Sequence, residues 1–332
     1  MKNKVTIKDV AKYAGVSPST VSRVLNNYLH IKPDKRQKVE EAIKELNFEP
    51  NEIARSLITN KSKTIGLVVD DISNPFFSET SKVIILKARQ LGYEILIYDT
   101  SGEEDLKKTL KFLLSRNLSG IIVGSVSRYD QNFEELVGES IPVVYFNRKP
   151  EKSNFFSVTM DNKKGSKMTI SHLIQKGHSR IAFIGGPFEY STYYDRYLGY
   201  YESINEFGLT IDEELILKGK PTNDYIQNFV TRILSKPDRP TAIVASTDQI
   251  AITVLDAIEK NNFRVPNDVA VIGFDNIQVS SNPYIGLTTI SQQKSKMAEL
   301  ALNTLILLIE KNLKETPEDV VISPKLITRK TT

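Results

Sequence analysis

The chain has 332 residues, of which 40% are hydrophobic and 25% are charged, so it is long enough for two or three packed domains of ordinary globular composition. It contains no cysteine, which excludes disulfide frameworks, thiolate nucleophiles and cysteine-ligated zinc. Its start lacks the continuous apolar run of a signal peptide, and no later segment reaches the roughly 18 uninterrupted apolar residues of a membrane span, so we expect a cytoplasmic protein.

The net charge of +4 is distributed unevenly along the chain. Residues 1–63 hold 13 Lys and Arg against seven Asp and Glu, whereas the remainder holds 31 against 33. A basic segment of this kind can be an ordinary solvated surface. It is also the electrostatic footprint of a protein that binds a polyanion.

A capping-box pattern opens the first predicted helix. The Thr6 hydroxyl and the Asp9 carboxylate can each accept a hydrogen bond from the other residue's backbone amide, so a helix should run over residues 7–14. Gly15 supplies a left-handed stop, and only about three residues separate this helix from the next.

A second helix is predicted after Ser17, which can cap it, with Pro18 at the first helical position. Its apolar side should face a small core through Val21, Val24 and Leu25, and its other side carries Ser19, Ser22, Arg23 and Asn26. A third helix is expected from about Pro33 to Asn47. Three short helices with one tight glycine-containing turn indicate a helix-turn-helix domain, whose second helix enters the DNA major groove.

Two ordered sets of motifs carry a family resemblance. The stretch "VTIKDVAKYAGVSPSTVSRVLNN", followed by "KVEEAIKELNFEPNEIARSL", resembles the head and hinge of the lactose-repressor/galactose-repressor family of bacterial transcription regulators. The resemblance continues through "IGLVVDDISNPFF", "GHSRIAFIGGP", "RPTAIVASTDQIA", "VPNDVAVIGFDN" and "LTTISQ", and so covers nearly the whole chain. It implies a repressor that binds a near-palindromic operator as a dimer and is not an enzyme.

The same resemblance assigns DNA contacts to the helix-turn-helix. Pro18 and Ser19 match the two positions that vary among members and select the operator sequence. Arg23 matches a base-reading arginine, a residue type that can make a bidentate contact to guanine. Further residues match groups that hold phosphates or orient the recognition helix, namely Ser17, Thr20, Ser22, Asn26 and His30, and Thr6 is also expected to contact DNA.

Residues 50–61 are expected to form a hinge helix. The segment is too short to be stable alone and should order only with a partner, although it could also be a linker with incidental apolar residues. By the resemblance, Leu57 wedges into the minor groove at the operator centre, where such a side chain kinks the duplex, and Ala54 permits close approach. Asn51 and Arg55 are well placed for phosphates or groove edges.

From residue 64 onward, apolar runs of strand length alternate with amphipathic helices. This pattern predicts parallel sheets buried on both faces, arranged in two doubly wound lobes, and the family's core is periplasmic-binding-protein-like. The expected organisation is an all-α helix-turn-helix head at 1–49, a hinge at 50–61 and an α/β core at 62–332. The lobes should interleave, with the N-lobe at about 62–161 plus 292–318 and the C-lobe at about 162–291 plus 319–330.

The residues that follow the predicted strands at their carboxyl ends are nearly all polar. Ligands of open α/β sheets bind beyond these ends, so the residues should converge on one cleft. They are Asp70 and Asp71, Gly124 and Ser125, Asn147, Gly185 and Gly186, Thr247 and Asp248, and Asp275 and Asn276. Each could instead start a helix, and for Asp248 the two interpretations are evenly balanced.

By the resemblance, Arg196 and Asp275 match effector-contacting positions. An arginine and a carboxylate that face a cleft can hold vicinal hydroxyls. One of Phe76 and Phe77 is expected to stack on an apolar ligand face, although such a pair more often belongs to a core. The complete set of expected effector-binding residues is Asn74, Phe76, Phe77, Ser125, Asn147, Tyr190, Arg196, Thr247, Asp248 and Asp275.

Two departures from the family pattern disfavour a purine effector. Tyr190 stands where purine-responsive relatives carry an arginine, and Pro221 lies near a position where several members place an aromatic lid. Tyr193 and Tyr194, together with Tyr190, can supply aromatic surface. We therefore expect a sugar or sugar derivative as effector, with no cofactor and no metal; whether it acts as inducer or corepressor does not follow from the sequence.

No sequence feature supports catalysis, because the chain has no phosphate loop, no nucleophile elbow and no clustered metal-ligand spacing. Two alternatives stay open. One is a global regulator of carbon metabolism that is controlled by a phosphoprotein partner. The other is a sugar-binding protein, which would not explain the head. Because no leucine heptads follow the core, we expect a dimer rather than a tetramer.

Overall fold

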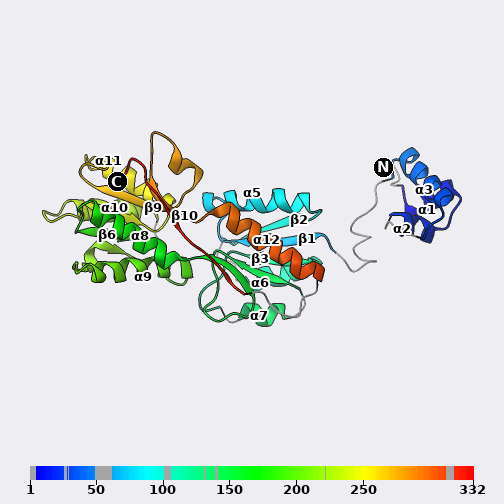
Figure 1. Ribbon diagram of the computed structural model, residues 1–332, viewed down its shortest axis with the longest axis horizontal. Coiled ribbons are helices and arrows are strands. Elements are labelled where there is room, and N and C mark those ends of the chain that lie inside the picture. Colours follow the sequence, from blue (N-terminus) through cyan, green and yellow to red (C-terminus); the bar gives the residue numbers. More distant parts are fainter. Residues whose placement is uncertain are drawn as a thin grey trace. The chain divides into compact units, whose positions relative to one another are not determined.

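The computed structural model describes residues 5–25, 28, 30–48, 62–100, 106–130, 132–138, 141–220, 222–311 and 318–332. The chain divides into two compact units, Met1–Ser62 and Lys63–Thr332, here named the head and the core domain (Figure 1). No helix in the described ranges is long and apolar enough to cross a membrane.

The head contains the helices α1 (Ile7–Ala14), α2 (Pro18–Leu25) and α3 (Pro33–Glu45). The predicted capping box is present, since Thr6 N donates to Asp9 Oδ2 at 2.9 Å and Asp9 N donates to Thr6 Oγ1 at 3.4 Å. Gly15 ends α1 with a φ of 65°, a left-handed conformation that glycine adopts without steric cost. Helix α3 ends two residues before the predicted Asn47.

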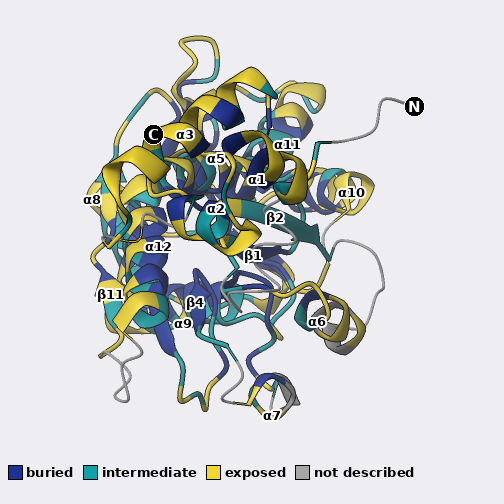
Figure 2. Cartoon of the chain, turned by 90° about the vertical axis from the view of Figure 1, so that its right-hand side faces the viewer, coloured by how far each residue is buried: buried dark blue, intermediate teal, exposed yellow. Residues whose placement is uncertain are grey.

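A small apolar core holds the three helices together. It is formed by Val10, Ala11, Ala14, Val21, Val24, Val39, Ala42 and Phe48. Helix α2 buries Val21 and Val24 and packs Leu25 partly against the same core, as its helical period predicts. The opposite faces of the three helices are exposed (Figure 2).

The N-lobe of the core domain has an all-parallel sheet in the order β11-β5-β4-β3-β1-β2. Its strands are β1 (Thr64–Val69), β2 (Glu94–Asp99), β3 (Gly120–Val123), β4 (Val143–Phe146), β5 (Phe156–Met160) and β11 (Val320–Ile322). Helices α5 (Pro75–Gln90) and α12 (Lys294–Lys311) cover one face, and α6 (Leu106–Leu114) and α7 (Asn132–Val137) cover the other. Burial on both faces explains the continuous apolar runs in the strand sequences.

The C-lobe sheet has the order β12-β10-β9-β8-β6-β7 and is parallel except for its edge strand β12. Its strands are β6 (Ile181–Ile184), β7 (Ile216–Leu217), β8 (Ala242–Ala245), β9 (Ala270–Asp275), β10 (Thr288–Ser291) and β12 (Lys325–Ile327). Helices α8 (Asn162–Gln175) and α9 (Ser191–Glu206) cover one face, and α10 (Asn223–Leu234) and α11 (Asp248–Lys260) cover the other. Two short 3-10 turns, η1 (Glu213–Leu215) and η2 (Gln278–Ser281), complete the lobe. The predicted fold class is thereby confirmed.

The chain crosses between the lobes three times, after β5, after β10 and after β11 (Figure 1). The third crossing lies later in the chain than predicted. The predicted C-lobe includes residues 319–330, but β11 pairs in parallel with β5 of the N-lobe. Asp319 anchors it there by accepting a hydrogen bond from Ser157 N at 2.8 Å. A three-residue strand carries too little pattern to reveal which sheet it joins.

Candidate functional sites

The outer side of α2 carries a short row of polar residues. Ser17, Pro18, Ser19 and Arg23 are exposed. Ser17 caps the helix as predicted, since its hydroxyl accepts a hydrogen bond from Thr20 N at 3.2 Å. A helix whose exposed face offers hydroxyls and one guanidinium can donate and accept hydrogen bonds at base edges and phosphates.

The other residues expected to contact DNA fall into two groups. Thr6 and His30 are exposed, and Thr20 and Ser22 are half-buried. The Thr6 hydroxyl also donates to Asp9 Oδ2 at 2.7 Å, and these hydrogen bonds lower the pKa of Asp9. The second group lies outside the described residues and comprises Asn26, Asn51, Ala54, Arg55 and Leu57, so the hinge contacts stay predictions.

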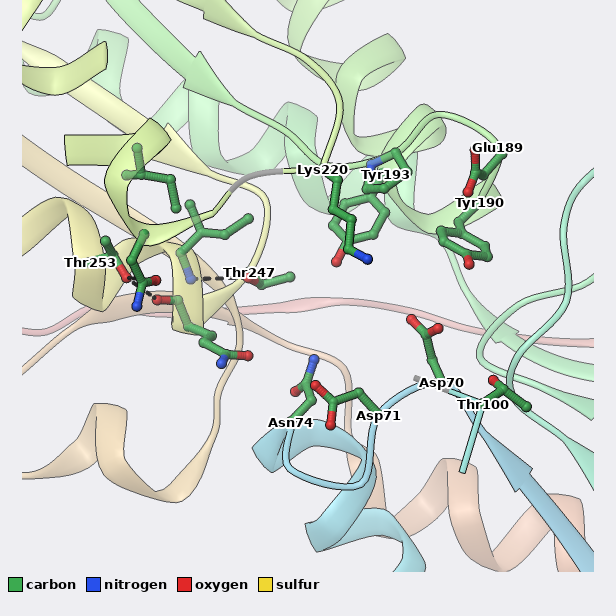
Figure 3. A pocket seen from close by; sticks show the side chains of 15 residues that line it. Asp70, Asp71, Asn74, Thr100, Glu189, Tyr190, Tyr193, Lys220, Thr247 and Thr253 are labelled. Carbon is green, nitrogen blue, oxygen red and sulfur yellow. Dashed lines mark hydrogen bonds between the residues drawn. The ribbon is translucent and has the colours of Figure 1, made fainter. Parts of the chain in front are cut away.

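The core domain contains a cavity of about 360 Å³ between its lobes, here named the main cavity. Asp70, Asp71 and Asn74 line it from the N-lobe, and Tyr190, Tyr193 and Lys220 face them from the C-lobe (Figure 3). Of the residues predicted to bind an effector, Asn74, Tyr190 and Thr247 belong to this wall. Pro221 lies outside the described residues.

Two helix starts point polar groups at the main cavity. Asn74 Oδ1 accepts a hydrogen bond from Phe76 N at 3.0 Å at the start of α5, and Thr247 Oγ1 accepts one from Ile250 N at 3.2 Å at the start of α11. Both side chains therefore serve as N-caps and wall residues together. Helix N-termini also favour partially negative ligand atoms such as hydroxyl oxygens.

A second, smaller cavity of about 180 Å³ also draws its walls from both lobes. Asn147 lies in its wall at the end of β4, with Asn162 and Asp195 contributed by the C-lobe. Asn147 has a φ of 66° and is only 5% exposed. A non-glycine residue held in this left-handed conformation stores strain, which concentrates at functional sites.

Arg148, the next residue, spans the lobes. Its guanidinium lies 3.9 Å from the ring centroid of Tyr190, and its Nη1 is 2.9 Å from Asp70 Oδ2. A parallel contact places the Arg128 guanidinium 3.5 Å from the ring centroid of Tyr194. Arg128 N also donates to the main-chain oxygen of Glu189 at 2.7 Å. Two arginines of the N-lobe thus pack against tyrosines of the C-lobe.

Arg196 and Asp275 lie one layer deeper than predicted. Both are buried, with exposures of 3% and 4%, and neither lines the main or the smaller cavity. Arg196 Nη1 is 3.4 Å from Asp275 Oδ1, and its Nε donates to Asn162 Oδ1 at 2.9 Å. Burial raises the pKa of Asp275 and lowers that of Arg196, while each charge opposes the shift of the other. Asp275 also has a φ of 116°.

Several buried polar atoms around the cleft have no hydrogen-bond partner among the described residues. They are Asn147 Oδ1, Arg148 Nε, Ser246 Oγ and Gln292 Oε1. Ser246 precedes the wall residue Thr247, and Gln292 donates to Asp275. Because buried polar groups are almost always paired, each of these four atoms is available for a further hydrogen bond.

Three effector predictions need correction. Phe76 and Phe77 are both buried in the N-lobe core, where their rings pack edge to face, so neither offers a face to the main cavity. Apolar residues at a helix start pack inward whenever the helix lies on a sheet. Ser125 is also buried, and its hydroxyl lies 2.7 Å from that of the wall residue Thr100.

Asp248 has a structural role. Its carboxylate is fully buried and accepts hydrogen bonds from Ile277 N at 2.9 Å, Ser280 Oγ at 2.7 Å and Thr289 Oγ1 at 2.5 Å. Burial, followed by the nearby charge of Asp275, raises its pKa to about 7. It fastens the loop after β9 to α11, so the non-effector interpretation of this residue holds.

Sequence reasoning did not single out Arg128, Arg148, Glu189 or Lys220. Arg148 could have been predicted from the sequence, because it directly follows Asn147, which the sequence places at a strand end in the cleft. The other three lie in loops, and only the folded arrangement of the lobes brings them to the cleft.

Comparisons with known proteins match both units. Residues 6–51 match the family model "Bacterial regulatory proteins, lacI family", and residues 170–332 match a periplasmic binding protein-like domain. The HTH-type transcriptional regulator RegA of Clostridium saccharobutylicum is 37% identical over 98% of this chain and 99% of its own length. This chain belongs to the LacI family.

Other LacI-family members are similar along most of the chain. Catabolite control protein A of Priestia megaterium is 33% identical over 91% of each chain, and the transcriptional repressor PurR of Mannheimia succiniciproducens is 33% identical over 98% of each. The lac repressor dimer bound to operator and an anti-inducer superposes with a TM-score of 0.87 at 27% identity, over 99% of both chains. These relatives are transcriptional regulators. The chain is accordingly a DNA-binding LacI-family regulator and not an enzyme.

Proposed function

We propose that this regulator is a dimeric repressor of a near-palindromic operator, and that a small sugar-like effector in the main cavity controls its affinity for DNA. The observation that carries the effector part is the main cavity itself, with its walls of carboxylates, amides, hydroxyls and two tyrosine rings. Hydroxyl-rich ligands need several hydrogen-bonding groups and an aromatic surface for the apolar face of the sugar ring.

Similar structures support a sugar as the ligand class. The transcriptional regulator CelR, in complex with cellobiose, matches this chain with a TM-score of 0.74 at 26% identity over 99% of this chain. A regulator from Alkaliphilus metalliredigens, in complex with D-xylulofuranose, matches with a TM-score of 0.71 at 31% identity over 82% of this chain. By analogy, we infer a mono- or disaccharide for this chain.

The contacts across the cleft supply the means of control. Arg128 and Arg148 bind the C-lobe only while the lobes hold their present arrangement. A ligand between the lobes therefore has a different affinity for this arrangement than for any other, and that difference is what shifts an equilibrium. If DNA binding also favours one arrangement of the lobes, a ligand that shifts the equilibrium between arrangements changes the operator affinity.

Dimerisation is supported by exposed apolar side chains on both lobes. Leu86 on α5 is 50% exposed, and Val279 and Tyr284 near η2 are 40% and 99% exposed. Gln278 N donates to Glu79 Oε1 at 2.8 Å, so η2 contacts α5. Exposed apolar side chains on both lobes suit a two-fold dimer, which in turn requires a near-palindromic operator read by two α2 helices in the cytoplasm.

Quantitative operator binding tests the proposal. The purified full chain is titrated with a DNA fragment from its own promoter region, alone and with a panel of neutral mono- and disaccharides. We expect a two-fold symmetric footprint and a change of at least about tenfold in operator affinity with one sugar. A footprint of a single half-site contradicts the dimer, and a response to a phosphorylated protein alone contradicts the sugar effector.

A further inference from the structure

We propose that the main cavity selects an uncharged or amine-bearing sugar and excludes phosphorylated sugars. The inference rests on the proposed function, because it specifies the chemistry of the same effector. It is carried by the distribution of paired and unpaired charges around the cleft.

The wall of the main cavity carries more carboxylates than cations. Its described members include Asp70, Asp71 and Glu189 but only one cationic side chain, Lys220. Asp71 Oδ1 accepts hydrogen bonds from Ser73 N at 2.8 Å and from Ser73 Oγ at 2.6 Å, and neither Asp71 nor Glu189 forms an ion pair with any described residue. Two carboxylates consequently face the cavity without a cation of their own.

The cations around the cleft, in contrast, are already paired with carboxylates. Arg148 pairs with Asp70 at 2.9 Å, Arg196 with Asp275 at 3.4 Å and Lys294 with Glu79 at 3.0 Å. The remaining two pairs are Arg128 with Glu151 and Lys149 with Asp319. A phosphate is recognised by cations that are free to bind it, usually arginine in bidentate geometry. Among the described residues that line the main cavity, only Lys220 is cationic, and it is exposed.

The contacts of Arg148 show that groups of the cavity wall bind a cation. Arg148 is 3% exposed, and its guanidinium contacts both the Asp70 carboxylate and the Tyr190 ring. Carboxylate and aromatic face together form a subsite for a cation, here filled by the chain itself. An ammonium group on a ligand can meet the uncompensated carboxylates of Asp71 and Glu189 in the same wall, which also carries Tyr190. A phosphate meets the repulsion of both carboxylates.

The predicted selectivity is large enough to measure. Asp71 and Glu189 both line the main cavity, so a bound phosphate shares it with two uncompensated carboxylates, and we expect their repulsion to lower its affinity by at least about tenfold. The neutral parent sugar avoids this repulsion, because its hydroxyls donate to the same carboxylates.

Matched sugar sets provide the test. Binding to the full-length protein is measured by calorimetry for D-glucose, D-galactose and D-mannose, each with its 2-amino and its 6-phosphate derivative. In each set that binds, we expect the amino sugar to bind at least as tightly as the parent and the 6-phosphate at least about tenfold more weakly. A 6-phosphate that equals or exceeds its parent overturns the inference.

A double variant assigns the effect to its residues. In Asp71→Asn with Glu189→Gln, the penalty on the 6-phosphate should fall to about threefold or less, because both substitutions remove charge and keep an accepting oxygen. The control variant, Glu259→Gln with Glu299→Gln, removes the same charge from exposed positions on α11 and α12 and should retain the full penalty. An unchanged penalty in the first variant overturns the inference.

Operator affinity separates this inference from the function on which it rests. A 6-phosphate that binds tightly and alters operator affinity leaves the proposed function intact and contradicts only the charge selectivity. If neither these sugars nor any mono- or disaccharide of the operator-binding panel binds, the proposed function is contradicted, and the inference that rests on it is contradicted with it.

Discussion

The head and the cleft use arginine in opposite ways. Arg23 stands exposed on α2, whereas Arg196 is buried beside Asp275 and over the ring of Phe274, 3.8 Å from its centroid. An exposed guanidinium costs the fold little and is ready to bind a macromolecule. A buried one is part of the fold, and its removal leaves an uncompensated charge. Two arginines that both match functional positions of the family should therefore have different effects when they are replaced. Loss of the exposed one affects binding, and loss of the buried one affects stability.

The largest predicted effect tests this contrast directly. Arg196→Met should lower the free energy of unfolding of the core domain by about 3–5 kcal/mol, because it leaves Asp275 buried without its cation. Arg23→Met should change it by less than about 0.5 kcal/mol. Urea unfolding of the full chain, followed by circular dichroism, measures both. Adding Asp275→Asn to Arg196→Met should recover part of the loss, and a double variant as unstable as the single one would contradict this explanation.

The pH dependence of stability should also differ between the two regions. Asp248 has a pKa of about 7 in the folded core, above its ordinary 3.8, so the stability it favours is complete below about pH 4 and is lost as the pH rises through 7. Between pH 5 and 8 the loss due to this group should be about 2–3 kcal/mol, and Asp248→Asn should remove that part of the pH dependence. Asp9 in the head has a lowered pKa, so its contribution is lost only as the pH falls through the folded pKa, below its ordinary value. Wild type and variant are compared by urea unfolding across this range; parallel curves would contradict the assignment.

The last predicted effect concerns DNA. Arg23→Ala should weaken operator binding by about 5- to 150-fold, the 1–3 kcal/mol typical of a bidentate base contact, with a smaller effect on random DNA. Lys44→Ala, which removes an exposed cation from α3, is the control and should affect operator and random DNA alike. Equal losses on both DNAs in Arg23→Ala would show that Arg23 contacts only phosphates.

The head was predictable in detail because its signals are local. A capping box links residues three apart, and the apolar period of α2 is complete within eight residues, so Thr6, Asp9 and Ser17 have the roles that the sequence indicates. The strand ends of the core were predictable for the same reason, since a buried parallel strand is a short continuous apolar run.

The cleft was only partly predictable because its side chains depend on contacts far apart in the chain. Asp248 begins a helix and follows a strand, and nothing nearby in sequence reveals that Ser280 and Thr289 bind it. Likewise, the depth of Arg196 is set by Asn162 and Phe274, which belong to other elements. Position along the sequence identified the neighbourhood of these residues, and packing decided which of them reach the cavity.

The three crossings between the lobes also govern how the protein emerges from the ribosome. The helices of the head end at Glu45, so this unit can close before any strand of the core has been synthesised. Neither lobe has that freedom, because the N-lobe sheet lacks its edge until Val320–Ile322 appear and the C-lobe sheet lacks its edge until Lys325–Ile327 follow. Both sheets therefore stay incomplete until residues 320–327 have been synthesised. A nascent regulator carries a finished DNA-reading head well before it carries anything that could respond to an effector.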